Sequence, residues 1–182
     1  MKLDRAELRR SLGSIEGGDR SYVPEFLSLL DLPGDVTSFH HYVPGHVTAS
    51  GFVTSPSQDS VALIHHRKLQ RWLQPGGHLE PGDADFEAAA RREVAEEIGL
   101  SNLFCLGLFD IDIHTFPGRP GTPEHLHFDL RFAFRSETEQ LSALDGVTDA
   151  RWVPFGDLDQ YGVDGSVARP VTKLVGLLIS GG

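Results

Sequence analysis

The chain has 182 residues, 26 of them acidic and 16 basic, which gives a formal net charge of −10. This balance argues against a general nucleic-acid-binding protein, which normally carries a basic face, although metal ions can make such a protein attractive to a small phosphorylated ligand. A hydrophobic content of 40% and a length suited to one domain predict a globular protein.

The first part of the chain is predicted to form a helical segment. Apolar residues recur at helical spacing in 3–15 and 22–31, namely Leu3, Leu8, Leu12 and Ile15, then Phe26, Leu27, Leu29 and Leu30. We therefore predict an N-terminal helical segment over 1–36 and a main domain over 37–182. The segment can pack against the core, cover a site or form a homodimer contact.

The start of the sequence, its apolar runs and its cysteine content indicate the cellular compartment. The start lacks the apolar core of a signal peptide, and no apolar run is long enough to span a membrane. The chain has one cysteine, Cys105, which suits a reducing compartment. We expect a cytoplasmic protein with no membrane partner.

Two strands, a glycine loop and an acidic helix follow the N-terminal segment. Residues 46–54 and 60–66 are strand-like, with a turn-rich stretch between them. Turn markers at 75–77 and 81–82 then predict a loop, after which Asp83 or Asp85 can cap a helix. Gly99 is placed to end that helix in a left-handed conformation.

The helix carries three glutamates, Glu93, Glu96 and Glu97, on one face. Three adjacent carboxylates repel one another, which lowers the stability of the fold. A hard divalent cation such as Mg²⁺ removes this repulsion, and its remaining coordination positions take water or substrate phosphates. A solvated face with surface ion pairs is the alternative.

The second half of the chain supplies more strands and a closing helix. Strands are expected over 103–114, 125–135 and 150–153, a short helix over 157–160 and a last helix over 166–180. Strands around a central helix, with a closing helix, predict an α/β fold with a mixed sheet.

Histidines mark the strand over 125–135. His125, His127 and Asp129 share one face of it, because alternate residues of a strand point the same way. These side chains can bind a transition metal, contact substrate phosphate or supply a general base. A polar outer face of a half-buried strand is the alternative.

The loop and helix resemble the signature of the Nudix hydrolases. Residues 92–100 match the second half of the signature at every position, and Gly77 with five residues before Asp83 matches the first. Eight residues separate Asp83 from Arg92, one more than the pattern has, so Asp85 is a second candidate for the loop acid. The resemblance extends over 43–160, and the HxHxD strand is similar to that of one branch of the family.

The resemblance implies a Nudix-like α/β/α sandwich and a hydrolase that cleaves a nucleoside diphosphate, or a similar diphosphate, linked to another group. It implies Mg²⁺ or Mn²⁺ held by Glu93, Glu96 and Glu97, with the Gly77 carbonyl as a further ligand. Arg92 would orient these glutamates and pair with the loop acid.

Two other functions compete with hydrolysis. A non-catalytic nucleotide sensor on the same fold is favoured by the extra loop residue but usually lacks one or more of the metal glutamates. A diphosphate isomerase normally needs a reactive cysteine, whereas Cys105 lies in an apolar stretch.

Substrate contacts are expected from side chains outside the signature. Trp72 can stack on a base or anchor the core, and Arg67 can meet phosphate. Glu137 and Glu139 are candidates for an additional acid.

Overall fold

The computed structural model describes residues 5–13, 15 and 18–180. Its helices are α1 (Arg5–Gly13), α2 (Val23–Asp31), α3 (Phe86–Ile98) and α4 (Gly165–Ser180), with the short 3-10 helices η1 (Gly18–Tyr22) and η2 (Phe155–Tyr161). Its strands are β1 (Gly45–Thr54), β2 (Ser60–His66), β3 (Arg71–Leu73), β4 (Gly76–His78), β5 (Leu103–Phe116), β6 (His125–Ser136) and β7 (Val147–Pro154).

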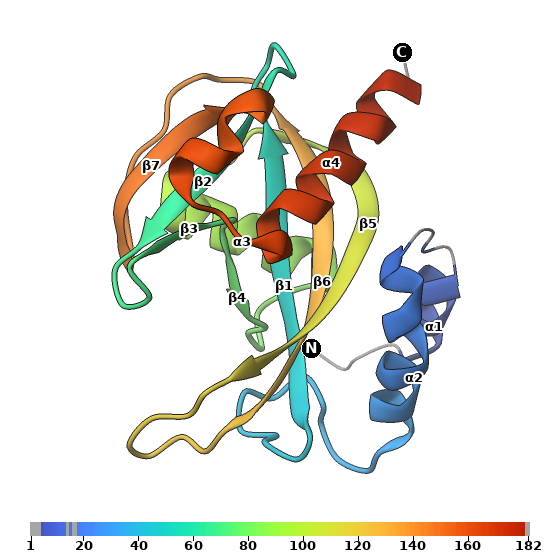
Figure 1. The fold of residues 1–182 in the computed structure, drawn as a ribbon. Helices are drawn as coiled ribbons and strands as arrows, with labels where there is room; N and C mark the ends of the chain where they lie inside the picture. Colours follow the sequence, from blue (N-terminus) through green and yellow to red (C-terminus); the bar gives the residue numbers. More distant parts are fainter. Residues whose placement is uncertain (1–4, 14, 16–17, 181–182) are drawn as a thin grey trace.

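The strands form one mixed sheet in the order β3-β2-β1-β6-β5, with β4 paired to β1 and β7 paired to β2. The central pair, β1 and β6, is parallel, and the other pairs are antiparallel. Helix α3 lies behind the sheet and α4 in front of it in Figure 1, so the predicted α/β fold with a mixed sheet is confirmed.

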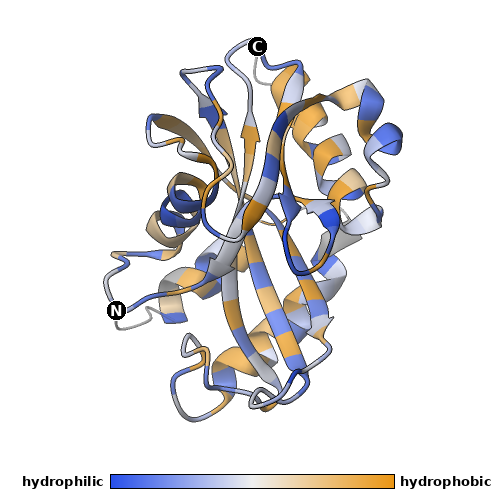
Figure 2. Ribbon diagram, turned by 90° about the vertical axis from the view of Figure 1, so that its left-hand side faces the viewer, coloured by the Kyte–Doolittle hydropathy of each residue, from blue (hydrophilic) through white to orange (hydrophobic). Residues whose placement is uncertain are grey.

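Strand alternation divides the core between the two faces of the sheet. On β1, Val47, Ala49 and Val53 join a buried cluster that also contains side chains of α1, α2 and α3. Phe52 points the other way, into a second cluster with residues of η2 and α4. Figure 2 shows this alternation as hydrophobic and hydrophilic residues that follow one another along the strands.

The N-terminal helices pack against the same core as α3. Leu8, Leu12 and Phe26 are buried in that cluster, and the Phe26 and Phe128 rings meet edge to face with centroids 5.3 Å apart. Leu3, expected in the first helix, lies outside the described residues. The division between 36 and 37 stays a prediction. Among the described residues, no helix combines the length and the hydropathy needed to cross a membrane.

The ends of α3 follow the predicted signals. The Asp85 side chain accepts a hydrogen bond from the Ala88 N–H, and Gly99 ends the helix with a φ of 75°. The prediction of a loop over 76–78 is wrong, because these residues pair with Thr48–Ser50 as β4. Glycine makes this pairing possible, since a Cβ on Gly76 would lie 2.8 Å from the Ser50 Cα.

Candidate active site

Arg92, in the middle of α3, organises the carboxylates that surround it. Its Nε and Nη2 donate to the two oxygens of Asp83 at 3.0 and 3.2 Å, a two-pronged pairing that fits the planar guanidinium. Nη1 donates to both Glu93 and Glu96 at 2.9 Å, and Nη2 donates to the His78 carbonyl at 2.8 Å.

The structure distinguishes the two candidates for the loop acid. Asp83 is buried and bonded to Arg92, and its Oδ2 also accepts from the Glu80 N–H at 2.7 Å. Asp85 instead caps the helix through the Ala88 N–H. The additional loop residue therefore leaves the pairing of Asp83 with Arg92 intact.

Glu93 and Glu97 point from α3 toward β4. The Gly76 N–H donates to Glu97 Oε2 at 3.0 Å. A Cβ on Gly77 would lie 2.6 Å from Glu93 Oε1, so a side chain at this position would displace the carboxylate. The glycine pair thus lets the helix bring two carboxylates against the strand backbone.

Burial changes the acidity of these two glutamates. It raises the pKa of Glu93, although Arg92 opposes the rise. It raises the pKa of Glu97 to about 8, with a smaller contribution from the negative charges of Glu93 and Glu96, while the Gly76 N–H opposes it. The ionised form of Glu97 is therefore disfavoured mainly by burial, and to a smaller extent by the two neighbouring negative charges.

This donor set fits a hard divalent cation. Carboxylate oxygens are the ligands that Mg²⁺ and Mn²⁺ take in proteins. A cation would offset the burial that chiefly raises the pKa of Glu97 and the smaller repulsion from Glu93 and Glu96. Glu93, Glu96 and Glu97 are the residues that can hold it.

A second group of polar side chains occupies the face of the sheet that β1 and β6 share. His46 and His125 are buried, His127 is half-buried, and the rings of His46 and His127 lie 5.0 Å apart between centroids. Burial lowers the pKa of His46 to about 4 and that of His127 to about 2, and neighbouring histidines add to both effects. Both rings are therefore neutral at pH 7.

The histidines lie near the Arg92 network through β4. His78 accepts from Arg92 through its carbonyl, and its ring lies 5.0 Å from that of His46 and 5.3 Å from that of His127. A cavity of about 200 Å³ opens beside His125 and His127, with Tyr42, Phe116 and Arg119 among its other lining residues.

Asp129 belongs to a buried ionic network and not to the histidine group. Its carboxylate accepts from Thr48 at 3.0 Å, from Ser50 at 2.8 Å and from Arg131 at 3.1 Å. Arg131, 1% exposed, also pairs with Asp110 and Asp112. The alternative of a polar outer face on a half-buried strand is wrong at these positions, because Asp129 and Arg131 are only 3% and 1% exposed.

Four residues of these two groups were not predicted from the sequence: His46, Asp110, Asp112 and Arg131. The alternation of polar residues in 110–114 and 125–131, within otherwise apolar strands, was the available signal. No local pattern marks His46, because the histidines beside it come from β6, a strand far along the chain.

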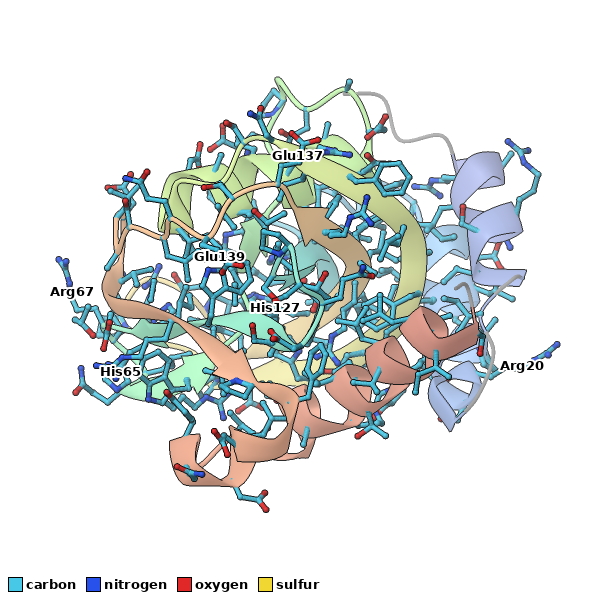
Figure 3. The ribbon with its side chains drawn as sticks, turned by 90° about the horizontal axis from the view of Figure 1, so that it is seen from above. Arg20, His65, Arg67, His127, Glu137 and Glu139 are labelled. Atoms are coloured by element: carbon cyan, nitrogen blue, oxygen red, sulfur yellow. The ribbon has the colours of Figure 1, made fainter. Side chains whose placement is uncertain are left out.

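The other residues predicted to contact substrate or to supply an additional acid lie away from the Arg92 network and the histidine group. Trp72 packs against the second core cluster and meets Tyr161 edge to face at 5.1 Å, as a core anchor would. Arg67 is exposed and points outward at the rim of the molecule in Figure 3. Glu137 and Glu139 are exposed on the segment after β6, part of which hydrogen-bonds to the end of α3. Their functional roles stay predictions.

Comparison with solved structures supports the same architecture. A NUDIX-family protein from Clostridium perfringens has 24% identity and a TM-score of 0.59, with 73% of this chain and 97% of that chain covered. An Ap4A hydrolase from C. elegans has 14% identity, a TM-score of 0.57 and coverages of 74% and 98%. The NUDIX domain of Shewanella oneidensis NrtR, in complex with ADP ribose, has 16% identity, a TM-score of 0.56 and coverages of 72% and 87%.

The family itself is established by sequence. A search of curated proteins finds no match to this chain. A model of the NUDIX domain, in contrast, matches residues 44–175, which is most of the chain and includes α3 and both glycines of β4. The chain therefore belongs to the Nudix hydrolase family.

Proposed function

We propose that this protein is a metal-dependent hydrolase of a diphosphate bond in a nucleoside diphosphate linked to another group, or in a related nucleotide. The observation that carries the proposal is the intact set of Asp83, Arg92, Glu93, Glu96 and Glu97, with the guanidinium bonded to three of the four carboxylates. The C. elegans and Shewanella oneidensis relatives, named for Ap4A hydrolysis and bound ADP ribose, support a substrate with a diphosphate or longer phosphate chain.

A divalent ion, Mg²⁺ or Mn²⁺, held by Glu93, Glu96 and Glu97 would neutralise phosphate charge and lower the pKa of a bound water. The protein's own part is to hold the ligands in place. Arg92 fixes Glu93 and Glu96 through one nitrogen, and Asp83 fixes Arg92 in turn. Glu97, once ionised, would serve either as a metal ligand or as the base that positions the attacking water.

The alternative, a non-catalytic nucleotide sensor, was favoured by the additional loop residue. The structure gives that alternative less support, because Asp83 still reaches Arg92 at 3.0 Å. A diphosphate isomerase is disfavoured by burial, which raises the pKa of the Cys105 thiol to about 11. We also propose a cytoplasmic protein with no nucleic-acid partner, whose N-terminal helices can form a homodimer contact.

The proposal is tested by following phosphomonoester release from nucleotide sugars, dinucleoside polyphosphates, ADP ribose and nucleoside triphosphates. Wild type, Glu97→Gln and the matched surface variant Glu87→Gln would be assayed with Mg²⁺, with Mn²⁺ and with EDTA. We expect turnover that needs the metal, that Glu87→Gln keeps and that Glu97→Gln loses. Tight nucleotide binding without turnover on any compound would instead favour the sensor.

A further inference from the structure

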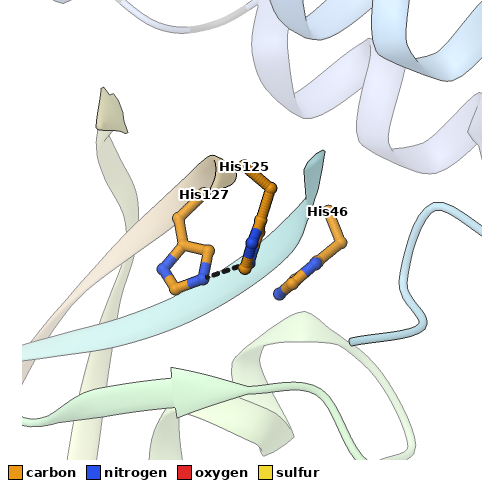
Figure 4. A group of neighbouring side chains, drawn as sticks. All are labelled: His46, His125 and His127. Atoms are coloured by element: carbon orange, nitrogen blue, oxygen red, sulfur yellow. Dashed lines mark hydrogen bonds between the residues drawn. The ribbon is translucent and has the colours of Figure 1, made fainter. Parts of the chain in front are cut away.

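Three histidines from the central pair of strands come together at one end of the sheet. His46 on β1 lies opposite His127 on β6 in the parallel register, and His125 precedes His127 by two residues on the same face. One ring nitrogen of each residue lies within 4.8 Å of those of the other two. Figure 4 shows the three rings turned toward one another.

Backbone carbonyls fix the tautomers of two of these rings. His46 Nδ1 lies 3.2 Å from the His41 carbonyl, and His125 Nδ1 lies 2.8 Å from the Pro123 carbonyl. A carbonyl oxygen only accepts hydrogen bonds, so both Nδ1 atoms carry the proton. When each ring is neutral, its Nε2 therefore carries a lone pair and no proton.

The lone pair of His46 meets no hydrogen-bond donor in the part of the chain that the structure describes. His46 is 0% exposed, and its Nε2 is buried without a hydrogen bond among the described residues. A buried acceptor without a donor is unfavourable, and such groups in native proteins usually mark an ion or a water. A carbonyl that holds Nδ1–H while Nε2 stays free is also the usual arrangement around a metal-bound histidine.

We propose that His46, His125 and His127 bind a transition-metal ion of the Zn²⁺ class, at a site separate from the helix glutamates. The Nε2 atoms of His125 and His127 are hydrogen-bonded to each other at 3.1 Å, a separation close to the roughly 3.3 Å that two imidazoles bound to one tetrahedral Zn²⁺ require. Imidazole nitrogens favour Zn²⁺, Cu²⁺ or Ni²⁺, whereas the carboxylates on α3 favour Mg²⁺. The two sites therefore differ in the ions they select.

The proposed ion has an approach from solvent. His125 and His127 line the cavity beside Phe116 and Arg119, so a water or a ligand oxygen can reach the ion from that side. Three histidines with one open position form the arrangement of a zinc site that binds an exchangeable ligand. Arg119, whose guanidinium carbon lies 5.7 Å from the centre of the Phe116 ring, adds a positive charge to this cavity.

The test uses the full chain after removal of metal with a chelator. Zn²⁺ would be titrated in competition with a chromogenic chelator, in the presence of excess Mg²⁺, for wild type, His125→Gln and His127→Gln. The control is His114→Gln, since this ring lies 5.3 Å from His127 but is not one of the three ligands. We expect one Zn²⁺ per wild-type chain, an affinity lower by about 100-fold or more in the two ligand variants, and wild-type affinity in the control.

Two further measurements keep the proposal open to refutation if a variant folds poorly. Co²⁺ bound to the wild-type protein should give the intense visible bands of a four-coordinate site, and Zn²⁺ should raise the Tm of wild type but not of His127→Gln. Weak octahedral bands would overturn the proposal. So would Zn²⁺ binding that Glu93→Gln abolishes while His125→Gln and His127→Gln retain it.

Discussion

Replacing Glu97 with glutamine should stabilise the metal-free protein at alkaline pH while it abolishes hydrolysis. The Glu97 carboxyl is 9% exposed, and its pKa rises from 4.5 to about 8 on folding. Glutamine has nearly the same shape and can still accept from the Gly76 N–H, but it carries no charge. The substitution thus removes the unfavourable ionised form and retains the hydrogen bond.

The sign of the effect follows from proton binding. Between pH 4.5 and about 8 the folded protein keeps the Glu97 proton and the unfolded chain does not, so the free energy of unfolding falls as pH rises. The full shift corresponds to about 5 kcal/mol at about 1.4 kcal/mol for each tenfold change in proton affinity. Solvent beside the exposed Glu96 screens the charge, so we expect a loss of about 2–3 kcal/mol.

Urea denaturation in EDTA at pH 5 and pH 8.5 measures this loss. Wild type should lose about 2–3 kcal/mol more between the two values than Glu97→Gln does, and Mg²⁺ should restore most of it. Titrations elsewhere in the protein cancel in this comparison. Glu87→Gln, which removes a half-exposed acid on the same helix, should follow wild type. Equal pH dependence in wild type and Glu97→Gln would refute the reasoning.

Three further substitutions test the site. Gly77→Ala should lower kcat/KM by about 100-fold, because the new Cβ would lie 2.6 Å from Glu93 Oε1. Unchanged kinetics would show that hydrolysis does not need Glu93 in this position. Arg92→Lys should lower kcat/KM by about 10–100-fold and the free energy of unfolding by about 1–3 kcal/mol. The reason is that lysine cannot reproduce the two-pronged bond to Asp83. The activity assay measures the first effect and a melting curve the second. Cys105→Ser should keep hydrolysis within about twofold of wild type, because a thiol whose pKa is raised to about 11 by burial is not an active nucleophile; a large loss would revive a reaction through cysteine.

The parts of the fold that local signals encode could be predicted from the sequence. Asp85 and Gly99 mark the ends of α3, and the spacing of Glu93, Glu96 and Glu97 places them on one face. The choice between Asp83 and Asp85 could not be made locally. It depends on how the loop folds back on Arg92, and spacing alone does not determine that path.

Features that depend on pairing between distant segments were missed. The strand β4 has only three residues, two of them glycine, and it exists because Gly76 and Gly77 can lie close to β1 and α3. The sequence left open whether the polar face of β6 forms a site or an outer surface, since alternation tells which residues share a face but not what covers it. Burial of Arg131 among three aspartates, with α4 held against the network by Arg169, became evident only in three dimensions.

Strand β4 lies between the glutamates of α3 and the histidines of β1 and β6. Its Gly77 lies against Glu93, the His78 carbonyl holds Arg92, and the His78 ring lies 5.3 Å from that of His127. We therefore expect a substrate whose diphosphate meets the glutamates to extend its remaining group along β4 toward the histidines and their cavity. The Nudix signature would then provide the hydrolysis, while the histidine end of the sheet, which lies outside the signature, would select the group beyond the diphosphate.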